Sequence, residues 1–256
     1  MIGLIECHFV DLGMKRLKKF YETVSIHPVV QNNSISSYRL MLDGRQVRTP
    51  LGDVLVLPNE AVAAAVAAEW QLQSSYVVPN SMPISTVLMT NIDVDSKQDR
   101  SEHLTRILRY FQTDAVRFPE NDRSKVLFSV QKDRWRPIFE YFAMKGVSIS
   151  QSSTGLALPE STQSELQTVN DKILSCYDSL GLSVLETASK YLKSGSLAVG
   201  LLDGKLCPEE AFKAAFVEEL CQRDVWGLVE GDHDLNQSET MLWLHGLRLV
   251  SSLFKL

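Results

Sequence analysis

The pattern of this sequence changes once, near Pro58, from strand-like to helical, and that change limits the possible folds more than any single motif. Three runs rich in β-branched and aromatic residues precede Pro58: YETVSIHPVV, SYRLMLDGRQVRTP and DVLVLP. Turn residues lie between and within these runs: Asn32-Asn33, Asp43-Gly44 and Leu51-Gly52-Asp53. We expect a small antiparallel meander in this part of the chain.

The pair Asp43-Gly44 predicts a tight hairpin between SYRLML and RQVRTP. Both central positions of a type I′ turn require a positive φ, which Asp and Gly adopt more readily than most residues. Arg45 follows the turn and begins the next strand, where a solvated charge is ordinary. We therefore assign structural roles to Asp43, Gly44 and Arg45.

The segment after Pro58 is expected to begin with a helix. Asn59 is a suitable N-cap, and the run EAVAAAVAAEWQLQSSY is rich in alanine, the best helix former. Trp70 lies in the C-terminal half of this helix and is interpreted as a core residue. Two prolines in the following VVPNSMPIST exclude a regular helix there. We place the domain boundary at this point, with a β-rich domain over residues 15–88 and a helical domain over residues 89–256.

Beyond the boundary the signals are those of helices. Leu104, Ile107, Leu108 and Phe111 recur at the spacing of one helix face. Further helices are expected at residues 138–145 with Pro137 in the first turn, at 161–180, at 183–194 after Gly181, from Pro208 to Trp226, and from a Ser238 cap onward. The expected fold class is α+β, with a small antiparallel β-rich domain followed by a larger all-α domain.

Composition excludes several classes of protein. The 256 residues include 26 Lys and Arg against 31 Asp and Glu, a net charge of −5, which argues against a general nucleic-acid-binding surface. No apolar run reaches the roughly 18 residues that span a bilayer. The four cysteines form no CxxC pair, so we expect reduced thiols and a reducing compartment.

The motifs that usually carry enzyme chemistry are missing. The sequence contains no GxGxxG, GxxxxGK[ST], HExxH or GxSxG motif, so dinucleotide-binding, P-loop, zincin and α/β-hydrolase functions lack their key residues. We expect no catalytic residue and no cofactor.

The segment QRDVWGLVEGDHD, residues 222–234, is the most unusual stretch of the chain. Trp226-Gly227 can end an amphipathic helix, because Gly adopts the left-handed conformation that often follows the last turn. Charged and imidazole side chains gather around this exit: Asp224, Glu230, Asp232, His233 and Asp234. An unpaired acidic cluster suits a basic partner, so we interpret it as a recognition surface.

The same cluster leaves a second hypothesis open. Glu230, Asp232, His233 and Asp234 offer carboxylate and imidazole groups, which are ligand types of divalent metals. A metal-dependent hydrolase is therefore the alternative function. Their spacing matches no metal-binding loop with a known mechanism, so the leading hypothesis assigns no metal to this site.

The N-terminus gives a mixed signal about targeting. Four basic residues stand together at Lys15, Arg16, Lys18 and Lys19. The same region also contains two acidic residues and no Ser, which is atypical of a mitochondrial presequence.

Eight short segments follow one another along the chain: KKFYETVSI, YRLMLDGRQVRTP, AAEWQLQ, PNSMPISTVLMTNID, YFQTD, Gln131 with WRP, Gly195-Ser196 and FVEELCQRDVWGLVEGDHD. Taken in this order, they resemble the ATP synthase mitochondrial assembly factor 2 family, which chaperones the alpha subunit of the catalytic head. They extend from about Arg16 to Asp234. One departure is Thr90-Asn91-Ile92-Asp93, where the family usually has Thr-Ala-Ile-Asp.

The resemblance implies a non-enzymatic chaperone of the mitochondrial matrix that binds the alpha subunit and no nucleic acid, does not insert into a membrane, and is monomeric when free. It further implies that Glu69, Trp70 and Pro83 are structural. The partner-binding residues that it implies are Glu219, Trp226, Gly227, Glu230, His233 and Asp234.

Overall fold

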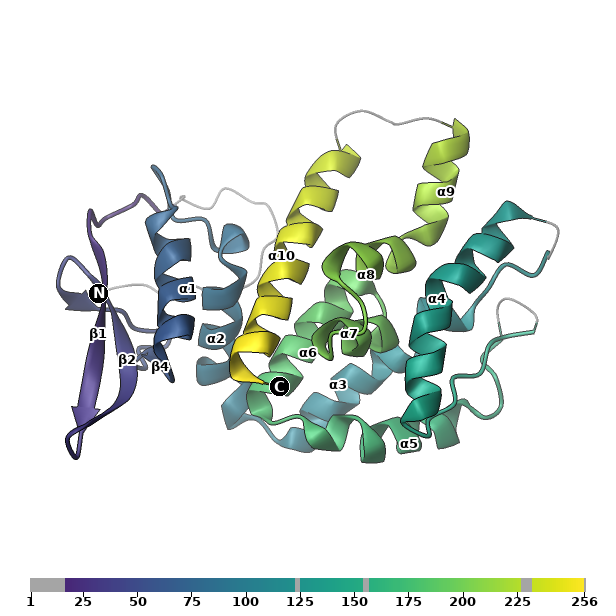
Figure 1. The fold of residues 1–256 in the computed structure, drawn as a ribbon, viewed down its shortest axis with the longest axis horizontal. Helices are drawn as coiled ribbons and strands as arrows, with labels where there is room; N and C mark the ends of the chain where they lie inside the picture. The colour runs from purple at the N-terminus through teal and green to yellow at the C-terminus, as the bar shows by residue number, and fades with distance from the viewer. Residues whose placement is uncertain (1–16, 123–124, 154–156, 227–231, 256) are drawn as a thin grey trace. The chain divides into compact units, whose positions relative to one another are not determined.

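The computed structural model describes residues 17–122, 125–153, 157–226 and 232–255 (Figure 1). Its internal contacts divide the chain into two compact units, residues 1–97 and 98–256. This division falls after α2, whereas the sequence-based boundary of 15–88 and 89–256 falls inside that helix; the sequence-based division remains a prediction. An N-terminal antiparallel sheet followed by helices confirms the α+β fold class.

The first unit contains a four-stranded antiparallel sheet and two helices. Its strands are β1 (Val24–Gln31), β2 (Ser34–Leu42), β3 (Arg45–Gln46) and β4 (Val56–Leu57), and its helices are α1 (Glu60–Gln71) and α2 (Pro83–Asp93). β2 pairs with β1 from Val24↔Leu42 to Gln31↔Ser34, and with β3 and β4 on its other edge. Both central residues of the turn between β2 and β3, Asp43 and Gly44, have positive φ, as a type I′ turn requires.

The core of this unit lies between the sheet and α1. Alternation along β2 turns Leu40 and Leu42 toward α1, where both are buried. Val62 and Val66 meet them from the helix, one turn apart on the same face. The Asn59 side chain accepts the Val62 N–H at 2.9 Å, so the predicted N-cap is confirmed.

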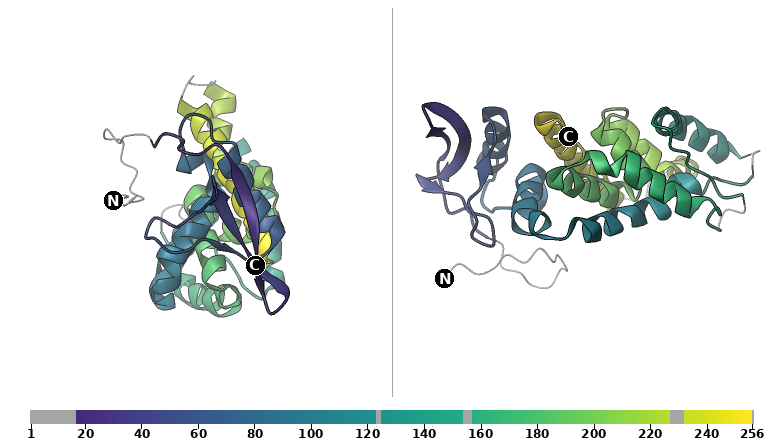
Figure 2. Two further views of the ribbon diagram at one scale, coloured as in Figure 1. Left: turned by 90° about the vertical axis from the view of Figure 1, so that its left-hand side faces the viewer. Right: turned by 90° about the horizontal axis from the view of Figure 1, so that it is seen from below.

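The second unit consists of helices around a fully buried one. The helices are α3 (Arg100–Gln112), α4 (Val126–Met144), α5 (Thr162–Lys172), α6 (Ser179–Leu192), α7 (Gly195–Leu202), α8 (Pro208–Ala215), α9 (Val217–Trp226) and α10 (Asp232–Phe254). Every residue of α7 is buried, and α3, α4, α6, α8 and α10 pack against it (Figures 1 and 2). A helix that is apolar all round occupies a core rather than a surface.

Several helix boundaries differ from those expected. α4 continues through Pro137, because Gln131, Trp135, Ile138 and Phe142 are buried on both sides of it and their burial offsets the roughly 3 kcal/mol that an interior proline costs. The helix expected from Pro208 to Trp226 is two helices separated at Phe216, and α10 begins at Asp232 rather than after Ser238.

Gly181 does not separate two helices as expected; it lies inside α6, and the break falls between α5 and α6 at residues 173–178. Its N–H donates to the Asp178 carboxylate at 2.7 Å, which caps the helix. A Cβ at position 181 would come within 2.8 Å of the Tyr177 ring. Glycine is therefore required here for close packing and not for a turn.

Among the described residues, no helix combines the length and apolar character needed to cross a lipid bilayer.

Candidate functional site

The residues expected to bind a partner belong to α9, to α10 and to the sequence segment between these two helices. Glu219 lies in the first turn of α9, where its side chain is 57% exposed and its Oε1 is 3.7 Å from the Lys193 Nζ. Trp226 is the last residue of α9, and His233 and Asp234 lie in α10; the side chains of these three are outside the described part of the structure. Gly227 and Glu230 lie outside the described residues.

The described part of α9 presents acidic side chains to solvent. Glu218, Glu219 and Asp224 are exposed, whereas Arg223 is half-buried. Arg223 Nη1 donates to the Gln237 Oε1 at 3.4 Å, which links α9 to α10. The helix therefore offers carboxylates to a partner while its one arginine is engaged with the neighbouring helix.

α9 takes its position from α4. The Gln131 side chain is buried and makes two hydrogen bonds: its Oε1 accepts the Glu120 N–H at 2.7 Å, and its Nε2 donates to Glu218 Oε1 at 3.1 Å. One turn later, Trp135 Nε1 donates to the Ala214 carbonyl oxygen at 2.9 Å. Gln131 and Trp135 thus hold the end of α8 and the beginning of α9, and the role of both side chains is positional.

Asp114 performs a similar task for the buried helix α7. Its carboxylate is fully buried, and Oδ2 accepts the Ser196 N–H at 2.8 Å in the first turn of α7. Burial raises the pKa of Asp114, while hydrogen bonds from Ser194, Ser196 and Val116 oppose that rise. A Cβ on Gly195 would lie 2.5 Å from the Phe111 ring, so only glycine lets α3 approach α7 so closely. Two segments of the family resemblance, YFQTD and Gly195-Ser196, therefore meet here.

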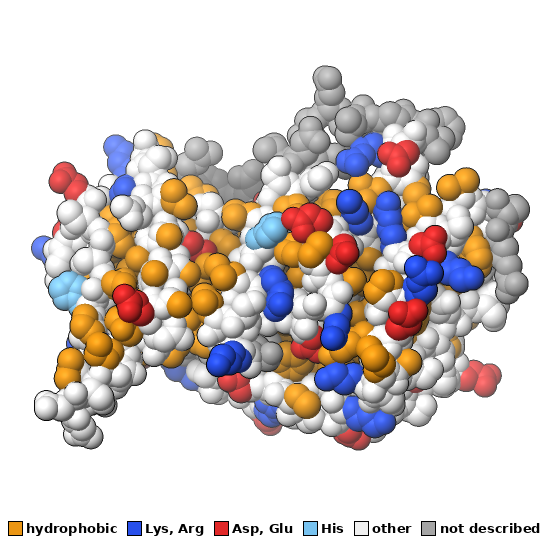
Figure 3. Space-filling model, in the orientation of Figure 1, with side chains coloured by type: hydrophobic (Ala, Val, Ile, Leu, Met, Phe, Trp, Pro, Cys, Tyr) orange, Lys and Arg blue, Asp and Glu red, His pale blue; other side chains and the backbone are white. Residues whose placement is uncertain are grey.

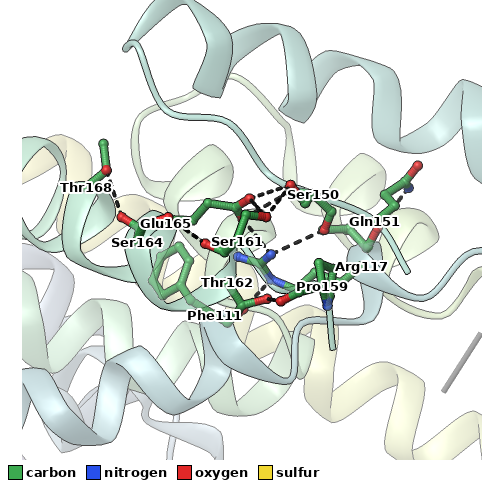
Figure 4. Close-up of polar contacts among 11 residues, drawn as sticks. Phe111, Arg117, Ser150, Gln151, Pro159, Ser161, Thr162, Ser164, Glu165 and Thr168 are labelled. Carbon is green, nitrogen blue, oxygen red and sulfur yellow. Dashed lines mark hydrogen bonds and ion pairs between the residues drawn. The ribbon is translucent and has the colours of Figure 1, made fainter. Parts of the chain in front are cut away.

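An ion pair between Arg117 and Glu165 lies under the loop that precedes α5 (Figure 4). The Arg117 side chain is 1% exposed and its Nη1 lies 2.7 Å from Glu165 Oε2; its Nε donates to the Phe111 carbonyl oxygen at 2.8 Å. Hydroxyl groups of Ser150 and Ser161 donate to Glu165 Oε1. Each charge thus has hydrogen-bond partners in addition to the opposite charge, which a buried pair needs.

These contacts predict an acid-sensitive contribution to stability. Burial tends to raise the pKa of Glu165, but hydrogen bonds from Ser150, Ser161 and Arg117 outweigh it and lower the pKa from 4.5 to about 2. Because the folded-state pKa is lowered, the stabilisation is complete above pH 4.5 and is lost as the pH falls toward 2. The difference in unfolding free energy between wild type and Glu165→Gln, measured in urea, should shrink over this range. A constant difference would contradict this assignment.

In the first unit, Glu69 and Pro83 shape the start of α2. The buried Glu69 carboxylate accepts the N–H groups of Ile84 and Ser85, each at 2.7 Å, and the Ser85 hydroxyl at 2.6 Å. Pro83 is the first residue of α2, where its missing N–H costs nothing. Burial raises the pKa of Glu69, and the three hydrogen bonds oppose that rise. Trp70 is also buried, with its carbonyl oxygen accepting the Tyr21 hydroxyl at 2.6 Å.

Glu69→Gln is expected to lower the unfolding free energy by about 1–3 kcal/mol. In the wild type both carboxylate oxygens accept a backbone N–H, whereas in the variant one of these N–H groups would face an amide NH₂ and lose its acceptor. Thermal and urea unfolding followed by circular dichroism measure this loss. Glu60→Gln, an exposed carboxylate at the start of α1, is the matched control and should change stability by no more than about 0.5 kcal/mol. Equal effects of the two substitutions would contradict the assigned role.

The buried carboxylates of Glu69, Asp114 and Glu165 hold helix ends or a buried arginine. Among the described residues, no group of three His, Cys, Asp or Glu side chains is arranged to hold a metal ion. Sequence reasoning missed the roles of Asp114, Arg117 and Glu165, since their partners are distant in the sequence. The segments YFQTD and Gly195-Ser196 of the family resemblance were the only signal for the role of Asp114.

The protein thus has an α+β fold in which buried carboxylates hold the ends of helices in place. The family model of the ATP12 chaperone protein matches residues 18–143. The chain is 27% identical over 250 residues to "Protein atp12, mitochondrial" of Schizosaccharomyces pombe, covering 89% of this chain and 86% of that protein. It is 26% identical over 272 residues to "Protein ATP12, mitochondrial" of Saccharomyces cerevisiae, covering 90% and 82%.

Solved structures agree in fold. Atp12 from Paracoccus denitrificans superposes with a TM-score of 0.70 at 22% identity, covering 92% of this chain and 96% of that one. The Atu1473 protein of Agrobacterium tumefaciens gives a TM-score of 0.77 at 24% identity, covering 92% and 85%.

This chain belongs to the ATP12 chaperone family. The chaperone class and the mitochondrial location expected from the sequence are confirmed by the family model and by the names of both curated relatives. The hydrolase alternative has no support in a family of chaperones. Its four candidate ligands include Glu230, outside the described residues, and three residues of α10 whose side chains are not described.

Proposed function

We propose that this protein binds the alpha subunit of the mitochondrial ATP synthase and promotes assembly of the catalytic head. Membership of the ATP12 family, with matches that span about nine-tenths of the chain, is the observation that carries the proposal. The mitochondrial names of the curated relatives support the compartment, and we place the protein in the matrix.

The physical task of such a chaperone is to cover an interface. A subunit that will later pack between two neighbours exposes a large apolar surface when it is alone, and patches of that size drive self-association. A chaperone bound to the same surface prevents aggregation. It is released when the correct neighbour binds that surface with a more favourable free energy.

We place part of the client contact on α9, on the segment that follows it and on the start of α10. The residues proposed for this contact are Glu219, Trp226, Gly227, Glu230, His233 and Asp234. Exposed Glu218, Glu219 and Asp224 support an electrostatic attraction to basic groups on the client. The surrounding framework of Gln131 and Trp135 positions α9 and is not proposed to touch the client.

Charge reversal tests this contact. Glu219→Lys and Glu230→Lys are each expected to weaken binding of the alpha subunit by about fivefold to fiftyfold with little change in stability, because each replaces an attraction by a repulsion. Glu102→Lys is the matched control, since Glu102 is another exposed carboxylate in a first helical turn. Wild-type affinity should also fall as salt rises. Salt-independent binding, unchanged in both variants, would overturn this placement.

A further inference from the structure

In the described part of the first unit, residues 17–97, no helix covers the face of the sheet that points away from α1. α1 packs against β1, β2 and β4 from one side, where Leu40, Leu42 and Leu57 are buried. The left view of Figure 2 looks toward the opposite side of the strands, and no helix of residues 17–97 lies over it.

The strand register places Arg39 in the middle of the open face. Its partner on β1 is His27 and its partner on β4 is Val56. Arg48 pairs with Val54 in an isolated bridge, and Val54 shares the face of Val56 because the two are separated by one residue. We call this set the basic sheet face, and its residues are Ser25, His27, Val29, Ser37, Arg39, Met41, Gln46, Arg48, Val54 and Val56.

The basic sheet face contains cations and no carboxylate. The side chains of Arg39 and His27 are exposed and make no hydrogen bond or ion pair with any described residue, while the Arg48 side chain donates to the Gly52 carbonyl oxygen at 2.8 Å. Two exposed carboxylates of the same unit, those of Asp43 and Asp53, are engaged elsewhere. Asp43 accepts the Thr23 N–H at 2.8 Å, and Asp53 pairs with Lys97 at 2.5 Å. The positive charge on this face is therefore not neutralised by described side chains.

The same face also carries more apolar surface than a solvated sheet face requires. Antiparallel sheets usually place polar residues on the side that meets water. Here Val56 is 48% exposed beside Arg39, and Val29, Met41 and Val54 are half-buried around them. At the hairpin tip Val30 and Ile35 pair with each other and are 61% and 56% exposed. Figure 3 shows hydrophobic side chains reaching the surface along this hairpin.

We propose that the basic sheet face binds an acidic segment of the client polypeptide whose carboxylates alternate with apolar side chains. Arg39 and Arg48 would pair with the carboxylates, since guanidinium groups form directed hydrogen bonds with them. Val56 and its apolar neighbours would cover the remaining side chains of the segment. This inference rests on the proposed function and adds a second contact of opposite charge to the acidic one at α9.

Charge and polarity changes on this face provide the test. The double variant Arg39→Glu with Arg48→Glu, and the single variant Val56→Asp, should each weaken binding of the ATP synthase alpha subunit by about tenfold or more. Matched controls in the helical unit are Arg136→Glu, with a 63% exposed side chain, and Val126→Asp, 76% exposed. Both controls should bind within about twofold of wild type, because single exposed charges usually contribute little.

The outcomes separate this inference from the function on which it rests. If wild type binds the alpha subunit and the sheet-face variants bind it equally well, the inference is overturned and the proposed function stands. If wild type does not bind the alpha subunit, the proposed function fails, and the inference that rests on it fails as well. Variants that keep client binding but no longer pellet with cardiolipin-containing vesicles would assign the face to a membrane and overturn the inference.

A photo-crosslinker at Ser37, on the same face, identifies the segment directly. With p-benzoylphenylalanine at this position in the full chain, irradiation of the complex should link it to an alpha-subunit peptide that contains Asp or Glu residues. A crosslink to a peptide without carboxylates, or none at all in a complex that forms, would overturn the proposal.

Discussion

Replacing Glu165 with alanine is expected to lower the free energy of unfolding by about 3–5 kcal/mol, because it leaves the Arg117 guanidinium charged, buried and without its counter-charge. Arg117 is 1% exposed, so water cannot replace the lost carboxylate. The Ser150 and Ser161 hydroxyl groups would also lose their acceptor. Urea unfolding at neutral pH measures the change.

Two comparisons make this expectation specific. Glu160→Ala removes an exposed carboxylate from the loop before α5 and should change stability by no more than about 0.5 kcal/mol. Glu165→Gln keeps the shape of the side chain and one of its two acceptor oxygens, so its loss should be smaller than that of alanine. A Glu165→Ala loss below about 1 kcal/mol would show that Arg117 finds another partner or reaches solvent.

Trp135→Ala is the second substitution expected to have a large effect, with a loss of about 3–5 kcal/mol in unfolding free energy. The ring is 1% exposed in the second unit, and its Nε1 donates to the Ala214 carbonyl oxygen at 2.9 Å. Removing it leaves both a cavity and an unpaired carbonyl group at the end of α8. Because α9 follows directly, client binding should weaken in the same variant.

Trp135→Phe separates the two contributions. Phenylalanine fills most of the cavity but cannot donate to the Ala214 carbonyl oxygen, so the loss should be about 1–3 kcal/mol. Arg136→Ala, at the neighbouring exposed position, is the control and should leave both stability and client binding unchanged. If Trp135→Ala unfolded at the same urea concentration as wild type, the packing role assigned to the ring would be wrong.

Local signals predicted the elements that depend on local chemistry. Asp43-Gly44 marked the hairpin because the turn itself requires two positive φ values, and Asn59 marked the start of α1 because its side chain caps that helix. The expectations based on Pro137 and Gly181 were wrong because they also relied on local preference alone. Their local preferences oppose or weaken a helix, but buried neighbours around Pro137 and the close approach of Tyr177 to Gly181 decide the structure.

The polar clusters could not be predicted from local pattern. Asp114 and Ser196 are 82 positions apart, and Arg117 and Glu165 are 48 apart, so only the folded chain brings them together. Family segments marked some of these places without indicating their role. Of the six residues expected to bind a partner, the described structure shows the side chain of Glu219 alone, which is exposed at the start of α9. Its proposed contact with the client remains a prediction.

Co-purification tests the central claim most directly. The tagged full-length chain is expressed with the ATP synthase alpha subunit or with the beta subunit, and each mixture is separated by affinity and size-exclusion chromatography. The account predicts a complex of one chaperone with one alpha subunit, which dissociates as beta subunits are added, and no complex with beta alone. Retention of neither subunit, or of beta alone, would contradict it.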